Sequence, residues 1–154
     1  MLRPRNHSRR RGHAIVEVSL MAPWIFFLCV GALDFGFYSY AAICTENAAR
    51  VAVQQTSIDA NSAASSATAC TYALGEMKSL PNMNGVTTCQ ASAGSISSSQ
   101  PLAVVATLVN PGADGTLASS VTVTYQTTQM IAIPGLMASN FTLVRTAQMR
   151  LREQ

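Results

Sequence analysis

The chain has 154 residues, of which 49% are hydrophobic and only 11% are charged, and its formal net charge is +3. An average soluble domain carries ~25% charged residues, so this balance favours a membrane-tethered chain over a free cytosolic enzyme. No histidine follows His13, only five acids follow Asp34, and Lys78 is the only lysine. Because a catalytic base or a metal centre needs such residues, we expect no enzyme, no metal site, no cofactor and no small-molecule substrate.

A basic leader occupies residues 1–12, with five arginines before Gly12 and no acidic residue. Arginines beside an apolar span mark its cytoplasmic side, so we expect a cytoplasmic N-terminus and an exported C-terminal part. A basic arm that binds nucleic acid is the alternative, but no basic face or aromatic platform follows to support it. The leader has no periodicity, and we expect it to be disordered.

An apolar segment follows the leader, and its sixteen residues from Val18 to Leu33 carry no charge. At 1.5 Å per residue they extend about 24 Å, slightly less than a ~30 Å hydrocarbon core. The segment spans a bilayer if Asp34 lies towards the outer boundary, because no charge follows until Glu46. Aromatic residues would then form a belt at the outer headgroups: Phe35, Phe37, Tyr38 and Tyr40. A cleaved secretory signal is disfavoured, because its apolar region has only ~7–15 residues.

The helix is predicted to continue well past the apolar span. No glycine or proline interrupts residues 37–58, so we predict one helix from about Ala14 to Thr56, with Pro23 as the point where a kink would form. Glu46 and Arg50 stand four residues apart in the order that favours an ion pair on a helix. The chain segments are therefore the leader (1–12), a transmembrane helix (13–57) and an exported head (58–154).

The head is predicted to be α+β, with a short helix before a small antiparallel sheet. Apolar residues at helical spacing favour a helix between Asp59 and Lys78. These residues are Ala63, Ala67, Cys70, Leu74 and Met77. A flexible linker is the alternative. Residues 102–109 form a β-rich run between prolines, residues 120–127 alternate cleanly and residues 141–151 alternate less strictly, so all three are predicted to be strands. Residues 86–91 are expected to add a short edge strand. The apolar connection MIAIPGLM, residues 130–137, is either buried under the sheet or an exposed contact surface.

The four cysteines fall into two pairs. Cys29 and Cys44 lie within or beside the apolar span and are expected to be small buried side chains. Cys70 and Cys89 lie in the exported part, where an oxidising compartment allows a disulfide. Closing that loop of about twenty residues would stabilise the head by roughly 3 kcal/mol.

The two acids of the helix do not form a catalytic pair. Glu17 and Asp34 would lie about 25 Å apart along one helix, whereas the carboxylates of a glycosidase lie within about 10 Å. A carboxylate in a membrane is costly and usually pairs with something. Glu17 either pairs or snorkels to the headgroups beside the leader, and Asp34 is a membrane acid of uncertain role near the helix exit.

The junction reads Arg-Arg-Arg-Gly12, then His-Ala-Ile-Val-Glu17, then an apolar run. It resembles the processing site of type IV pilins and pseudopilins, which a membrane aspartyl peptidase cuts after the glycine. Pro23, Asp34-Phe35-Gly36 and residues 47–50 (Asn-Ala-Ala-Arg) narrow this resemblance to the TadE-like minor pseudopilins of the tight-adherence (Tad/Flp) type IVb pilus. The strand at residues 121–125 and the end near Ala-Gln-Met-Arg also look like that family. One departure is Val18, where many Tad prepilins have tyrosine.

The resemblance implies a minor pilin-like subunit that a prepilin peptidase cuts between Gly12 and His13. Glu17 would then pair with the new α-amino group of a neighbouring subunit. The implied partners are the bacterial inner membrane, the peptidase, other pilins and the Tad assembly platform, with the head periplasmic or extracellular and the subunit incorporated in the pilus. The alternative is an unprocessed, single-pass adaptor of a secretion or envelope complex.

Overall fold

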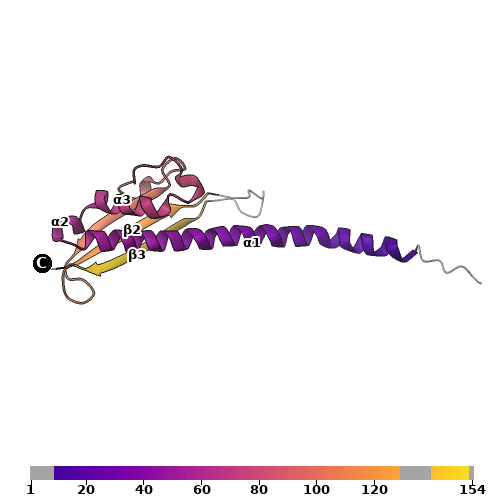
Figure 1. Cartoon of the computed structure of the whole chain (residues 1–154), viewed down its shortest axis with the longest axis horizontal. Coiled ribbons are helices and arrows are strands. Elements are labelled where there is room, and N and C mark those ends of the chain that lie inside the picture. The colour runs from indigo at the N-terminus through magenta and orange to yellow at the C-terminus, as the bar shows by residue number, and fades with distance from the viewer. Residues whose placement is uncertain (1–8, 129–139, 153–154) are drawn as a thin grey trace, which may run out of the picture. The chain divides into compact units, whose positions relative to one another are not determined.

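The computed structural model describes residues 9–128 and 140–152, with side chains from His13 onward (Figure 1). Its elements confirm the predicted α+β class. They are the helices α1 (Arg9–Thr56), α2 (Ala60–Ala63) and α3 (Ser66–Met77), the 3-10 turns η1 (Pro81–Met83) and η2 (Ala93–Ser95), and the strands β1 (Leu102–Val109), β2 (Ala118–Gln126) and β3 (Thr142–Arg150). The connection MIAIPGLM lies outside the described residues.

Helix α1 ends at Thr56, as predicted, but it begins at Arg9 rather than near Ala14. The prediction of a disordered leader is therefore wrong for residues 9–12. Arginine is a good helix former, and a single glycine at position 12 does not stop a helix that is already formed on its C-terminal side. Pro23 lies inside α1 and does not end it.

The chain forms two compact units, residues 1–37 and residues 38–154, so the division falls within α1. We call them the N-terminal unit and the C-terminal unit. The second half of α1 is part of the C-terminal unit, together with the head. The segment boundaries drawn from the sequence after residues 12 and 57 stay predictions.

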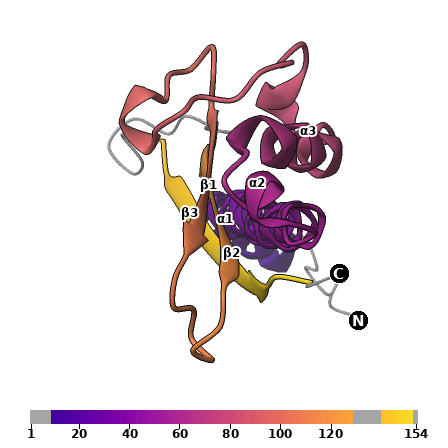
Figure 2. The same ribbon diagram turned by 90° about the vertical axis from the view of Figure 1, so that its left-hand side faces the viewer.

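The sheet of the C-terminal unit has three antiparallel strands in the order β1-β2-β3. Leu102 is opposite Tyr125, which is opposite Leu143 on its other side. Figure 2 shows α2, α3 and the second half of α1 on one face of this sheet. Alternate residues of β1 and β2 point to that face, and they are buried there: Leu102, Val104, Ala106, Val121, Val123 and Tyr125.

Helix α1 runs alongside β2 in the opposite direction. At one end the Thr56 and Ser119 hydroxyls are hydrogen-bonded at 2.8 Å. At the other end the ring of Tyr38 packs edge-on against Phe141, with centroids 5.0 Å apart, and the Thr127 amide donates to the Phe141 carbonyl. Tyr38 to Thr56 is about 27 Å of helix, and Ser119 to Thr127 is about 27 Å of strand. Helix and strand are therefore matched in length.

The segment after α1 is helical, and the flexible-linker alternative is wrong. However, the predicted apolar face is only partly right, because Ala67 is exposed and Cys70 and Leu74 are only partly buried. The chain breaks between α2 and α3, and Ser65 caps α3 by accepting a hydrogen bond from the Thr68 amide. This break shifts the helical phase, so the buried residues are Ala63, Ala69, Ala73 and Met77.

The predicted edge strand at residues 86–91 is wrong. Only Gln90 pairs there, in parallel with Ala103 of β1. The chain turns away after this residue into η2, whose first residue is Ala93. One bridge therefore replaces a strand at this edge of the sheet.

The hydroxyl of Tyr125 is held inside the C-terminal unit. It donates a hydrogen bond to Asn82 Oδ1, and Asn82 Nδ2 donates to the Gln126 carbonyl at 2.9 Å. Burial raises the pKa of Tyr125 from 10.0 to about 12, against the opposing effect of Asn82. The folded state therefore favours the neutral phenol.

This pKa predicts an alkaline loss of stability. The raised pKa stabilises the fold fully below pH 10, and this contribution is lost as the pH rises towards 12. A Tyr125→Phe variant should lack this component, so its unfolding midpoint in urea should fall less than that of the wild type between pH 9 and pH 12. A Tyr72→Phe variant, altered at an exposed tyrosine, is the matched control. Equal alkaline losses in all three proteins would contradict the assignment.

Candidate functional site

The predicted processing site lies in the first turns of α1. Helix α1 begins at Arg9, so the bond between Gly12 and His13 is part of the helix. His13 and Glu17 are both exposed. They stand four residues apart, which places them on the same face of the helix. Their predicted roles in cleavage and subunit pairing are not tested by this geometry.

Glu17 begins an apolar groove along one face of the N-terminal unit. The groove has a volume of about 790 Å³ and is lined by Glu17, Val18, Met21, Ala22, Ile25, Phe26 and Cys29. These residues recur at intervals of three and four, as on one face of a helix. Ala22 is small and lies between the larger Val18 and Phe26 on this face. Such a face can accept the ridge of a second helix, with Glu17 as its one charged member.

Asp34 lies on the same helix as Glu17, but Asp34 is buried, with 6% of its surface exposed, whereas Glu17 is exposed. The 17 positions that separate them on α1 correspond to about 25 Å along the axis. The structure thus keeps the two acids apart, and the role of Asp34 stays open.

The large apolar side chains of the N-terminal unit are mostly exposed, Trp24 and Phe35 among them. The helical stretch His13–Thr56 is long and apolar enough to cross a membrane, by length and composition alone. Cys29 is exposed, so its predicted burial is wrong, since no other part of the described N-terminal unit covers this surface. Cys44, in the C-terminal unit, is buried as predicted.

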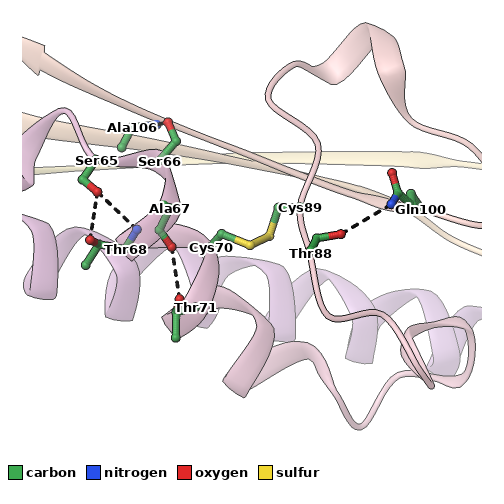
Figure 3. The surroundings of a disulfide bond; sticks show 10 residues. All are labelled: Ser65, Ser66, Ala67, Thr68, Cys70, Thr71, Thr88, Cys89, Gln100 and Ala106. Atoms are coloured by element: carbon green, nitrogen blue, oxygen red, sulfur yellow. Dashed lines mark hydrogen bonds between the residues drawn. A yellow bond between two sulfur atoms is a disulfide. The ribbon is translucent and has the colours of Figure 1, made fainter.

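The predicted disulfide between Cys70 and Cys89 is present (Figure 3). It joins α3 to the segment that forms the Gln90 bridge with β1. Four residues before Cys70, the Ser66 hydroxyl accepts a hydrogen bond from the Ala106 amide of β1 at 3.0 Å. Helix α3 is thus tied both to the first strand and to the loop that precedes it.

The pair between Glu46 and Arg50 forms as predicted, with 3.0 Å between Arg50 Nη2 and Glu46 Oε1. The sequence pattern did not indicate that Arg145 of β3 approaches the same carboxylate, at 3.6 Å. Nor did it indicate Asn82 as the partner of Tyr125. Both contacts join residues more than forty positions apart, and no local spacing signals them.

Residues 12–54 match the model of a protein family described as TadE-like protein. No curated protein and no solved structure matches the chain. The matched segment begins at Gly12 and includes Glu17, Pro23 and Asp34, which confirms the resemblance drawn from these residues. The match associates the chain with the Tad pilus, whose TadE-like subunits are typically structural, and with membrane-associated pilin partners.

Proposed function

We propose that this chain is a minor, pilin-like subunit of a Tad pilus, because residues 12–54 match the model of the TadE-like family. A prepilin peptidase cuts it after Gly12. The observation that carries the proposal is the position of Glu17: it is exposed at the start of an apolar helical groove, five residues after the glycine with which the family match begins.

Cleavage adds water across the Gly12–His13 peptide bond and leaves a carboxylate on Gly12 and an α-amino group on His13. The peptidase must first unwind the start of α1. Glycine disfavours a helix by about 1 kcal/mol relative to alanine, and the cations of Arg9–Arg11 oppose the positive end of the helix dipole. Both effects make the first turn of α1 the easiest one to open.

Removal of the leader changes the electrostatic environment of the Glu17 carboxylate. Its carboxylate then lies near the start of the shortened helix, where the helix dipole favours a negative charge. In a bundle of subunits the α-amino group of a neighbour can donate to this carboxylate in a medium of low dielectric constant. The groove beyond Glu17 offers the neighbour's helix an apolar surface. Pairing at Glu17 therefore sets the register between subunits.

The size of the chain supports a minor role. Major Flp-type pilins are short, whereas here a three-stranded sheet and two further helices follow α1. Such a unit adds bulk to each position that it occupies in a filament. In the membrane before assembly, α1 is the anchor, with its arginine leader cytoplasmic.

The role of Glu17 is tested in a strain that lacks the gene, complemented with the wild type or with Glu17→Gln. The amide keeps the shape of the side chain but not its charge, so we expect the variant in the membrane fraction at the wild-type level and a loss of tenfold or more in sheared pili, about 1.4 kcal/mol or more of pairing energy. Quantitative immunoblots of both fractions measure this ratio.

Glu76→Gln, altered at an exposed acid of α3, is the matched control and should enter pili normally. Normal incorporation of Glu17→Gln would refute the pairing role. Unchanged surface pili in the deletion strain would instead favour the unprocessed adaptor.

A further inference from the structure

One end of the C-terminal unit carries three aromatic side chains, of which two are exposed and one is half-buried. We call Tyr38, Tyr40 and Phe141 the aromatic collar. Phe141 is 48% exposed and Tyr40 is 47% exposed. Tyr38 contacts the ring of Phe141 edge-on, and the Tyr40 hydroxyl is hydrogen-bonded to the Ser79 hydroxyl at 3.0 Å. The collar thus joins α1, the residue before β3 and the turn after α3.

The collar is held firmly in place. The Thr127 amide donates to the Phe141 carbonyl at 2.8 Å, and the Thr127 hydroxyl lies 3.1 Å from both the carbonyl and the amide of Phe141. Three hydrogen bonds therefore fix the backbone that presents this half-exposed ring. A large apolar ring in water costs free energy in proportion to its exposed area, so a surface that covers the ring would be stabilising.

The collar lies where the apolar helix enters the C-terminal unit. Tyr38 is the first residue of that unit and continues α1 without a break. The sequence carries no charge between Phe35 and Thr45, and the described residues next to Phe141, which are Thr127, Thr128 and Asn140, are uncharged as well. Lys78, beside Ser79, is a cation that suits lipid phosphate. The opposite end of the unit, near Thr56, is charged instead: Asp59, Asp114, Arg150 and Arg152.

We propose that the aromatic collar rests in the headgroup region of a phospholipid bilayer, so that the C-terminal unit lies on the membrane before assembly. Tyrosine prefers this region because its ring is apolar and its hydroxyl is polar. The inference rests on the proposed membrane anchoring of α1. An aromatic end that carries the cation of Lys78 and directly follows the apolar helix in the chain, together with a charged opposite end, favours lipid over a second copy of the chain.

The experiment uses tryptophan as a depth probe. Trp24 is the only tryptophan, so single-tryptophan proteins can be made in a Trp24→Phe background: Phe141→Trp and Tyr40→Trp at the collar, and Leu117→Trp as the control. Leu117 is 36% exposed and lies next to the start of β2, at the opposite end of the sheet. The full chains are reconstituted in vesicles of phosphatidylcholine and phosphatidylglycerol with brominated acyl chains.

We expect bromine to quench both collar tryptophans several-fold more than the Leu117→Trp probe, with emission shifted to the blue. Quenching no greater than that of Leu117→Trp would overturn the inference, and protection from both bromine and aqueous iodide would point to a second copy instead. Bromine quenching of Trp24 in the unmodified chain distinguishes membrane anchoring by α1 from the contact of the aromatic collar with lipid. If it is quenched while the collar is not, the anchor stands and the collar contact fails; if Trp24 is not quenched, both fail.

Discussion

A Gly12→Val variant is expected to keep its arginine leader, whereas the wild type extracted from membranes should lack the mass of residues 1–12. The valine side chain would obstruct a peptidase that must approach the backbone closely, and a β-branched residue is stiff there. Intact-protein mass spectrometry of the membrane fraction measures the cleaved share, which we expect to fall from nearly complete to a trace. Surface pili should decline in parallel if the subunit is needed for assembly.

Gly31→Val is the matched control for this variant. A side chain added at Gly31 would meet no atom within 4 Å, and the position is far from the cleaved bond, so the control should be processed normally. An intact leader on the wild-type protein would contradict processing altogether. Complete cleavage of Gly12→Val would show that the glycine is not required.

Removal of the disulfide should have the largest effect on stability. In the chain-entropy model, a bridge that spans 19 positions stabilises the fold by about 3 kcal/mol. A Cys70→Ser/Cys89→Ser variant should therefore unfold at a markedly lower urea concentration. The segment from Gly85 to Gln100 contains only a 3-10 turn and two isolated bridges, so proteolysis should cut the variant there first.

Urea unfolding of the full chain in detergent micelles, followed by circular dichroism, measures the loss. Cys29→Ser is the matched control, because Cys29 is an exposed free thiol and its replacement should leave the midpoint unchanged. A double variant that unfolds with the wild type would show that α3 and the loop hold together without the bridge.

Much of the fold follows from local patterns. Strand β1 has the predicted bounds, because its β-branched run is closed on both sides by proline. Helix α1 continues to Thr56 as predicted, since no glycine or proline occurs between Phe37 and Thr56. In both cases the signal lies within the element itself.

Two of the interactions that the sequence did not indicate leave no periodic pattern, and one error concerns helix propensity. Ser65 caps a new helix and shifts the buried face from Ala67 to Ala69. Arg145 reaches Glu46 only after the sheet has formed. The start of α1 at Arg9 reflects the good helix propensity of arginine, which the expectation of a disordered basic leader ignored.

The candidate processing site was predicted from a short sequence motif, whereas the fold was predicted from the periodicity of its elements. The arginines, Gly12 and Glu17 form a short motif, and residues 12–54 match the TadE-like family. The apolar groove that begins at Glu17 follows from helical spacing. The sequence pattern could not reveal that Asp34 is buried. Cleavage after Gly12 and pairing at Glu17 stay predictions.

The antiparallel alignment of α1 and β2 has a mechanical consequence. A pull on the N-terminal end of α1 acts along the axis of the helix. The contacts from Tyr38–Phe141 to Thr56–Ser119 then bear the load together, in shear, rather than one after another. The Arg152 amide, which donates to the Ser57 carbonyl, ties the chain beyond β3 to the far end of the same helix. The C-terminal unit is thus built to move with α1 under tension instead of peeling from it.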